Sequence, residues 1–364
     1  MTEKSKILTD KRQILIIYTG GTIGMKPSAH GYEPDINFPD NVLNDLGAIE
    51  DDNFPNFVIE TLEPLLDSSN MNPDDWDRIA EVITENYDDF DGFIVLHGTD
   101  TMAYTASALS YILNDIKKNV IVTGSQIPYC EVRNDARANL ITTLMICAQC
   151  DIPEVTLYFN NKLFRGCRSV KVDASHLDAF ASPNYPALAE IGVELSLTGR
   201  RQFDIQVNPT LIRKKKQRKK LNPAYINKTD DVKEYDVGVL RLFPGISAKY
   251  VKNILRKPLK GLVLESFGVG NGPTKERNPK LFEAIRKATQ EDNIVIVAVT
   301  QCVRGSVVLD GYATSLKAAG VISGYDMTVE AALTKLYYLI SYTKHDMEQV
   351  KIKMQEDLKG ELTK

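Results

Sequence analysis

The chain has 364 residues, of which 43% are hydrophobic and 25% charged, and its formal net charge is −4. This length suits two domains, and the composition is that of an ordinary soluble globular protein. The slightly negative balance provides no general attraction for nucleic acid or for anionic membranes, so we expect neither as a partner.

Other features of the chain favour a cytoplasmic protein. The first residues are polar and do not form the apolar core of a secretory signal. No apolar run approaches the roughly 20 residues that span a bilayer. The five cysteines are an odd and sparse set, which fits a reducing compartment better than a disulfide framework.

In the first half of the chain, short apolar runs alternate with helical patterns. Strands are predicted at 14–18, 57–62, 93–97, 119–123 and 154–159, and helices at 76–87, 101–116 and 135–150. The strands are nearly continuous runs of Val, Ile and Leu, as expected when both faces of a sheet are covered. The alternation favours an α/β fold with a mostly parallel sheet and helices on both of its faces.

The pattern stops at a dense basic run from Arg213 to Lys220 and then resumes. We predict strands at 237–242, 261–266 and 294–300, and helices at 247–255, 278–290, 328–342 and 345–358. The expected organisation is a larger N-terminal α/β domain (1–206), a linker (207–234) and a smaller C-terminal parallel-sheet domain (235–364). The basic run is interpreted as a solvated insertion, because no aromatic residues are interleaved with it to stack nucleic-acid bases.

Six predicted strands end in glycine together with hydroxyl, amide or carboxylate side chains. These ends begin at Thr19, Asp67, Gly98, Gly124, Phe267 and Thr300. The carboxyl ends of parallel strands share one edge of a sheet, where ligands bind, so the pattern predicts an active site there. The alternative is that turns and helix caps use Gly, Ser, Thr and Asp in any case.

The first of these ends, Thr19-Gly20-Gly21-Thr22, requires a tight turn or a close approach of the backbone. It is not G-x-G-x-x-G, it lacks the Lys-Ser/Thr pair of a P-loop, and no acidic residue closes a second strand about 20 residues later. A turn that presents Thr19 or Thr22 to a small ligand is therefore favoured over a phosphate site.

A threonine hydroxyl attacks only when another group takes its proton. The sequence offers two arrangements, Thr22 with Tyr32, and Thr99 with its neighbour Asp100 and a cation such as Lys171. An aspartate can hold a lysine in place, and a buried lysine can accept a proton. The alternatives are that Asp100 caps the following helix and that Lys171 is a solvated surface residue.

The sequence gives little support for metal or thiol chemistry. The histidines, at 30, 97, 176 and 345, have no ligand spacing. Cys147 and Cys150 fit a packed helix face better than a zinc or redox site. There is no G-x-S-x-G motif, and Cys302 fits a small residue at the site edge better than a nucleophile. We expect neither a metal nor another cofactor.

Several motifs together resemble bacterial-type L-asparaginases, and most of all their cytoplasmic type I branch. They are Thr19-Gly-Gly-Thr22-Ile-Gly, Asp67-Ser-Ser-Asn-Met71, His97-Gly-Thr-Asp-Thr-Met102, Val122-Thr-Gly-Ser-Gln-Ile-Pro128 and Gly268-Val-Gly-Asn-Gly272. The resemblance covers nearly the whole chain. It implies hydrolysis of the side-chain amide of L-asparagine to L-aspartate and ammonia, through a threonine acyl-enzyme and without a metal. It also implies a homotetramer built as a dimer of dimers.

The resemblance also implies roles for single residues. Thr22 matches the nucleophile, and Tyr32 the mobile tyrosine that partners it. Thr99, Asp100 and Lys171 match a second catalytic cluster.

The implied substrate site lies in two further segments. Asp67, Ser68 and Ser69 match the loop that binds the α-amino and α-carboxylate groups. Asn271 resembles a residue that a neighbouring subunit contributes to the site.

Some type I enzymes share a regulatory asparagine site with a Thr-x-Cys such as Thr300-Gln-Cys302, and with a basic residue where this chain has Glu265. An acid there repels an amino-acid carboxylate, so we expect no activation by asparagine. Two other functions remain open, the amide-cleaving subunit of a tRNA-dependent amidotransferase and a non-catalytic amino-acid sensor.

Overall fold

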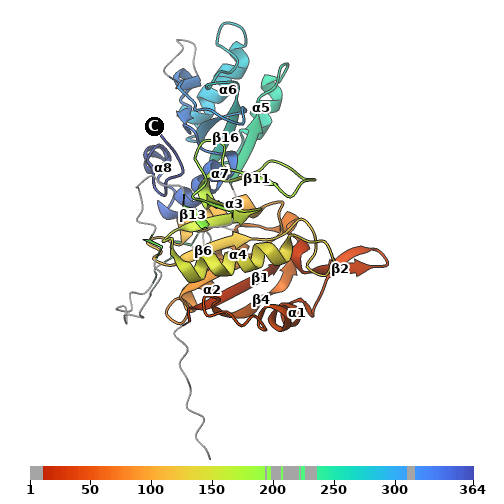
Figure 1. The fold of residues 1–364 in the computed structure, drawn as a ribbon. Helices are drawn as coiled ribbons and strands as arrows, with labels where there is room; N and C mark the ends of the chain where they lie inside the picture. The colour runs from red at the N-terminus through yellow and green to blue at the C-terminus, as the bar shows by residue number, and fades with distance from the viewer. Residues whose placement is uncertain are drawn as a thin grey trace, which may run out of the picture.

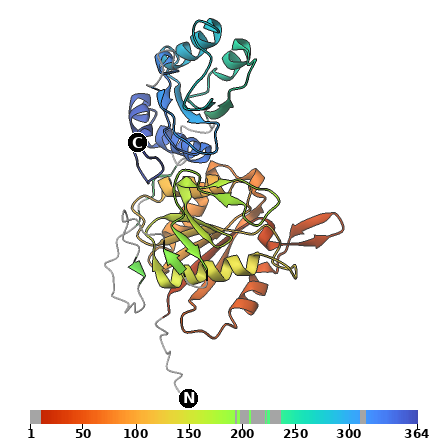
Figure 2. The ribbon, with the colours of Figure 1, turned by 45° about the horizontal axis from the view of Figure 1, so that its top comes forward.

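The computed structural model describes residues 11–192, 195–197, 206–207, 221, 223–225, 236–309 and 316–364. The basic run from Arg213 to Lys220 lies outside these residues, as does most of the predicted linker. Two sheets form two bodies, one carrying the red-to-green N-terminal part of the chain and the other the teal-to-blue C-terminal part (Figures 1 and 2).

The N-terminal sheet has eight strands in the order β13-β12-β9-β8-β6-β5-β1-β4. Its parallel part contains the five predicted strands, observed as β1 (Gln13–Gly20), β4 (Asn56–Leu66), β5 (Gly92–Leu96), β6 (Asn119–Thr123) and β8 (Val155–Phe159). Three short antiparallel strands, β9 (Lys162–Arg165), β12 (Ala189–Ile191) and β13 (Leu195–Leu197), extend it. They were not predicted, because three or four residues are too few to show a periodicity.

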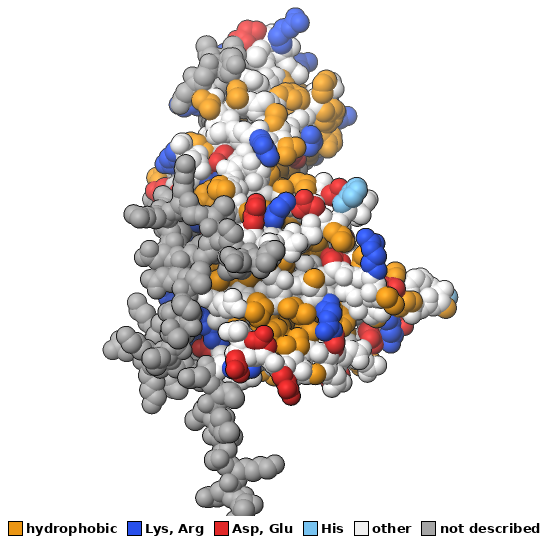
Figure 3. Space-filling model, in the orientation of Figure 1, with side chains coloured by type: hydrophobic (Ala, Val, Ile, Leu, Met, Phe, Trp, Pro, Cys, Tyr) orange, Lys and Arg blue, Asp and Glu red, His pale blue; other side chains and the backbone are white. Residues whose placement is uncertain are grey.

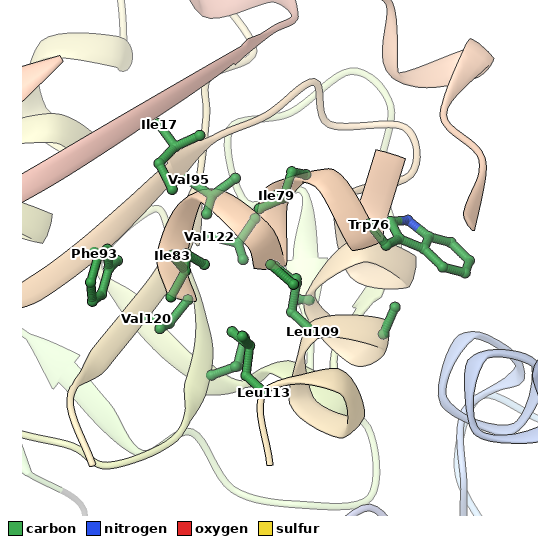
Figure 4. Packing of buried hydrophobic residues seen from close by; sticks show 14 of the residues in the cluster. Ile17, Trp76, Ile79, Ile83, Phe93, Val95, Leu109, Leu113, Val120 and Val122 are labelled. Carbon is green, nitrogen blue, oxygen red and sulfur yellow. The ribbon is translucent and has the colours of Figure 1, made fainter. Parts of the chain in front are cut away.

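Helices cover both faces of this sheet, as predicted. The helices α2 (Pro73–Glu85) and α3 (Met102–Ile112) pack on one face, and α1 (Phe38–Leu46) and α4 (Ala136–Gln149) on the other. The side chains of β1 alternate between them, with Ile17 facing α2 and α3, and Ile16 the opposite side. Figure 4 shows the first of these cores, where Ile17, Phe93 and Val122 of the sheet meet Ile79 and Leu109 of the helices.

Some predicted helix ends were wrong by one to four residues. The helix α2 begins three residues earlier than predicted, because Asn72 and Asp75 form a capping box and Pro73 occupies the first turn. The helix α3 ends at Ile112, four residues early, and α8 (Met347–Met354) is shorter than 345–358. The helix α1 was not predicted.

The smaller sheet is parallel throughout, with the strand order β15-β16-β17-β18. Its strands are β15 (Val237–Arg241), β16 (Gly261–Ser266), β17 (Val295–Thr300) and β18 (Ile322–Ser323). The helices α5 (Ala248–Ile254) and α6 (Pro279–Gln290) cover one face, and α7 (Val329–Tyr342) and α8 the other. The rings of Tyr111 and Tyr338 stack 5.7 Å apart and join α3 to α7 across the two bodies.

Short elements surround the larger sheet. The strands β2 (Met25–Ser28) and β3 (Gly31–Pro34) form a hairpin that projects from the body (Figure 1). The strands β10 (Val170–Lys171) and β11 (Phe180–Ala181) form a second ribbon, and β7 (Cys150–Asp151) pairs with β14 (Gln206–Val207). Charges of both signs are interspersed on the face in Figure 3. None of the helices in the described ranges has the length and apolar character to cross a membrane.

Candidate active site

Four of the six polar strand ends come together at one edge of the larger sheet. They follow β4, β1, β5 and β6, which are neighbours in the sheet. In chain order, the loops after β1, β4 and β5 are called the first, second and third loops. The other two follow β16 and β17 and belong to the separate C-terminal sheet. The prediction that all six share one edge was wrong, because the last two ends belong to the C-terminal sheet, which the sequence itself predicts as part of a separate domain.

Glycines allow these loops to touch. Gly21 has φ +88°, and a Cβ built on it would lie 2.4 Å from the Cα of Gly98. A Cβ on Gly98 would in turn lie 2.5 Å from the Oγ of Ser68. Gly21 after β1 and Gly98 after β5 therefore allow the first, second and third loops to touch.

The structure separates the two threonines of the first loop. Thr19 is buried, and its hydroxyl donates a hydrogen bond to the carbonyl of Leu96 (2.9 Å). Thr22 is half-buried and begins the short helix η1 (Thr22–Gly24) at the loop surface. Thr22 is thus the more accessible hydroxyl of the pair.

Tyr32 lies on the projecting hairpin and is 54% exposed. Its hydroxyl donates to Oε1 of Glu131 (2.8 Å), and this hydrogen bond raises the pKa of the phenol above its ordinary value. Among the described residues, no hydrogen bond joins Tyr32 to Thr22. The predicted pair is not assembled in this conformation.

The second predicted cluster is assembled. The Lys171 amine lies 2.8 Å from Oγ1 of Thr99 and 2.6 Å from Oδ1 of Asp100. Its side chain is only 19% exposed, so it is not a solvated surface lysine. Thr101 rather than Asp100 is the N-cap residue of α3, which removes the capping alternative for Asp100.

Gln126 completes this cluster and was not among the predicted site residues. The Thr99 hydroxyl accepts from Lys171 and donates to Oε1 of Gln126 (3.2 Å). The carboxylate of Asp135 accepts hydrogen bonds from the backbone N–H groups of Gln126 (3.0 Å) and Ile127 (2.9 Å) and so fixes this loop. The signal was present, since Gln126 stands in a polar strand end.

The predicted substrate loop lies beside the first and third loops. Asp67 caps the short helix η2 (Ser68–Asn70), with Oδ1 accepting from the N–H of Ser69 (2.8 Å). Ser68 is buried, and its carbonyl accepts from the Thr101 hydroxyl (2.7 Å). Asp67 and Ser69 are exposed, whereas Ser68 joins its loop to the third loop.

A buried hydrogen-bond chain supports the third loop. Nδ1 of His97 lies 2.7 Å from the carbonyl of Gly98, and Nε2 lies 2.8 Å from the Thr105 hydroxyl, which accepts from Nε1 of Trp76 (3.1 Å). A carbonyl only accepts, so Nδ1 carries the proton and Nε2 accepts from Thr105. Burial lowers the pKa of His97 to about 4, so the ring is neutral. His97 was predicted only as a histidine without metal-ligand spacing.

The remaining predicted residues lie in the C-terminal domain. Asn271 is exposed and closes a turn by backbone hydrogen bonds to Phe267. Thr300 donates to the carbonyl of Gly268 (2.6 Å) and accepts from the N–H of Cys302 (3.0 Å).

The Glu265 carboxylate forms an ion pair with Arg241 (3.1 Å). The sequence alone does not show this partner. A second acid, Glu330, begins α7, and burial raises its pKa to about 7.

Cys147 and Cys150 were predicted to lie on a packed helix face, and this is confirmed for Cys147 on α4, whereas Cys150 is buried but begins β7. Both are buried, and burial raises the thiol pKa of Cys147 to about 12 and that of Cys150 to about 11.

Comparison with known proteins identifies the family. Residues 13–202 match the N-terminal asparaginase domain, and residues 236–354 match the glutaminase/asparaginase C-terminal domain. The chain therefore belongs to the asparaginase family.

Its relatives include L-asparaginase 1 of Escherichia coli, 45% identical over 360 residues, which cover 97% of this chain and 98% of that protein. The crystal structure of L-asparaginase I from Vibrio cholerae superposes with a TM-score of 0.84 at 43% identity, covering 97% of this chain and all of that one. The thermostable L-asparaginase from Thermococcus kodakarensis superposes with a TM-score of 0.80 at 32% identity, covering 97% and 99%.

Proposed function

We propose that this protein is a cytoplasmic L-asparaginase that hydrolyses L-asparagine to L-aspartate and ammonia without a cofactor. The observation that carries the proposal is the contact of the Lys171 amine with both Thr99 and Asp100 at the edge of the larger sheet. The names of the relatives give the substrate, since the L-asparaginases of E. coli and V. cholerae match nearly the whole chain.

In the proposed reaction Thr22 is the nucleophile. Its Oγ attacks the amide carbon, ammonia leaves, and the resulting ester is cleaved by water. When substrate brings the hairpin to the first loop, Tyr32 leaves Glu131 and relays the proton: the phenol oxygen takes the Thr22 proton as its own proton passes to the amide nitrogen that leaves as ammonia. Backbone N–H groups of the glycine-rich turns stabilise the oxyanion.

Thr99, Asp100 and Lys171 serve the second half of the reaction. Asp100 holds the Lys171 amine against the Thr99 hydroxyl, and the cluster activates the water that cleaves the ester. Gln126 orients Thr99 by accepting its hydroxyl hydrogen.

Substrate recognition is assigned to the second loop. Asp67 pairs with the substrate ammonium, and Ser68 and Ser69 serve the carboxylate, so amides without an α-amino group are excluded. We assign Asn271 to the site of a neighbouring subunit in a homotetramer, in keeping with its exposure on the C-terminal domain.

Product analysis with L-Asn, D-Asn and L-Gln side by side tests the proposal. We expect ammonia mainly from L-Asn, and a fall of at least about 10³-fold in kcat in Thr22→Ala and in Lys171→Ala. Thr22→Ser, which keeps a hydroxyl, is the matched control and retains activity. Full activity in a folded Thr22→Ala would exclude Thr22 as the nucleophile.

Two outcomes would favour the other functions. Salt-sensitive tRNA binding that disappears when residues 213–220 are deleted would indicate an amidotransferase subunit. Thermal stabilisation by asparagine with no product formed would indicate a sensor.

We also expect hyperbolic rates against asparagine concentration. Thr300 pairs in the sheet with Ser266, directly after Glu265, and an acid near this position repels the carboxylate of an amino acid. Initial rates from about 0.1 to 10 times KM measure this. A sigmoidal curve that becomes hyperbolic in Thr300→Ala would establish activation by asparagine.

A further inference from the structure

The ribbon that carries Lys171 is tied to the C-terminal domain at both of its ends. Within it Lys171 pairs with Phe180, and Val170 with Ala181. Arg168 lies three residues before Lys171, and Asn184 lies three residues after Ala181.

At the first end, the Arg168 guanidinium is 2% exposed and makes three contacts with the other domain. It forms an ion pair with Oδ2 of Asp326 (2.9 Å) and donates to the carbonyl of Gly360 (2.6 Å) and to the Thr363 hydroxyl (2.9 Å). The planar guanidinium thus donates to two separate acceptors and places its charge against a third group, the Asp326 carboxylate.

At the second end, the side-chain amide of Asn184 uses both of its groups. Its Nδ2 donates to the carbonyl of Asp326 (2.9 Å) and to that of Gly305 (3.2 Å), while its Oδ1 accepts from the N–H of Gly305 (2.9 Å).

Asp326 is thus the common partner of both ends. Its carboxylate binds Arg168 and accepts from the N–H of Thr363 (2.6 Å), and its carbonyl binds Asn184. It is buried and lies just before α7. The C-terminal segment in turn is fixed by a fully buried ion pair between Lys335 and Glu361.

We propose that the C-terminal domain positions the Lys171 amine through Arg168 and Asn184, with Asp326 as the residue on which both anchors converge. The ribbon has two paired residues on each strand and a further backbone bond from Val172 to Ala179, and so short a ribbon is not stable alone. Phe180 holds its middle against the core of the larger domain, and the two anchors fix its ends and thereby the place where Lys171 meets Thr99 and Asp100. Arg168, Asn184 and Asp326 are positioning residues, and none of them contacts Thr99 or Asp100 in the described structure. The inference rests on the proposed role of Lys171 in hydrolysis.

The test compares Arg168→Lys and Asn184→Ala with a matched control, Arg12→Lys. Arg12 lies at the start of β1, and its guanidinium likewise makes three contacts, with the carbonyls of Cys147 (2.8 Å) and Cys150 (3.1 Å) and with Asp151 (2.8 Å). Because a displacement of about 1 Å at a reacting group costs up to about 10²-fold in rate, we expect kcat to fall about 10- to 100-fold in both anchor variants. KM should change less than about threefold, since the substrate loop is not touched, and Arg12→Lys should keep kcat.

Hydrogen–deuterium exchange measures the anchoring independently of activity. Peptides covering residues 169–182 should exchange faster in Arg168→Lys and Asn184→Ala, and at an unchanged rate in Arg12→Lys. Unchanged exchange, or unchanged kcat in the folded anchor variants, would overturn the inference, as would an equal fall of kcat in the control. If the unaltered protein releases no ammonia, the proposed function fails while the exchange rates still decide the anchoring.

Discussion

At the scale of single residues, His97 shows how a neutral side chain supports the site. It is completely buried, and its ring nitrogens form hydrogen bonds with the carbonyl of Gly98 and with the hydroxyl of Thr105. Gly98 is the residue directly before Thr99. A charged ring would place two donors where one donor and one acceptor are needed. The third loop therefore depends on the neutral form of His97.

This predicts a pH dependence of folding stability that belongs to His97. The unfolded ring binds a proton below about pH 6.5 and the folded ring only below about pH 4, so stability is lost as pH falls from 6.5 towards 4. Relative to His97→Gln, the native protein should lose on the order of 3 kcal/mol over this range. Urea unfolding of both proteins at pH 7.5 and pH 4.5 measures the difference. Equal losses in the two proteins would contradict the prediction.

At the scale of elements, the site is a contact between loops. The turn after β1 approaches the turn after β5 so closely that Gly21 has no room for a Cβ, and Ser68 in the turn after β4 leaves no room for one at Gly98. The geometry of Thr22 relative to Thr99 follows from this contact, because each threonine is adjacent to one of the two glycines.

Replacement of Gly21 by alanine tests this packing, and Gly245 is a matched control. Both have φ +88°, but a Cβ on Gly245 would meet nothing within 4 Å. Gly245→Ala should cost only the backbone strain of about 1–2 kcal/mol. Gly21→Ala should cost a further 1–3 kcal/mol or so and lower kcat, because the third loop must move and because the ψ of Gly21, 176°, lies in a region that essentially only glycine adopts. Thermal unfolding and ammonia release measure both effects. Equal results in the two variants would show that the loop contact is unimportant.

At the scale of the whole molecule, a buried ion pair in the C-terminal domain fixes the end of the chain that contacts the N-terminal domain. Lys335 of α7 and Glu361 of the C-terminal segment are completely buried and form an ion pair. Glu361 also accepts hydrogen bonds from the N–H groups of Leu358 and Lys359. The attraction of Lys335 and these hydrogen bonds keep the pKa of Glu361 below its ordinary value despite burial. The pair thereby fixes the segment in which Gly360 and Thr363 accept hydrogen bonds from Arg168 of the N-terminal domain.

Lys335→Met should destabilise the protein by about 3–5 kcal/mol, because it leaves the Glu361 carboxylate buried without its cation. The control is Lys351→Met on α8, whose ion pair with Glu348 is largely exposed and should contribute less than about 1 kcal/mol. Denaturant unfolding of both variants measures the contrast. A small effect of Lys335→Met would show that water reaches Glu361.

A neighbouring subunit is the second prediction at this scale. If Asn271 completes the site of another subunit, Lys171→Ala and Asn271→Ala are each inactive as separate preparations. Mixed after dissociation and reassembly, they should recover about a quarter of the native activity, because half of the dimers are hybrids and each hybrid has one intact site. No recovery in verified hybrids would place Asn271 in its own subunit's site or outside the site.

Elements with a strong local signal could be predicted from the order of the residues alone. The five parallel strands of the larger sheet are long apolar runs, and the polar residues at strand ends, together with the motifs, indicated Thr22, Thr99 and Lys171. Which of these residues meet was decided by the tertiary structure. In the tertiary structure the polar strand ends are divided between two sheets, and the Lys171 amine contacts Thr99. Tyr32 forms a hydrogen bond with Glu131, and Arg168 forms one with Gly360 near the C-terminal end of the chain. These contacts join residues distant in sequence, and they depend on packing that no local pattern of residues encodes.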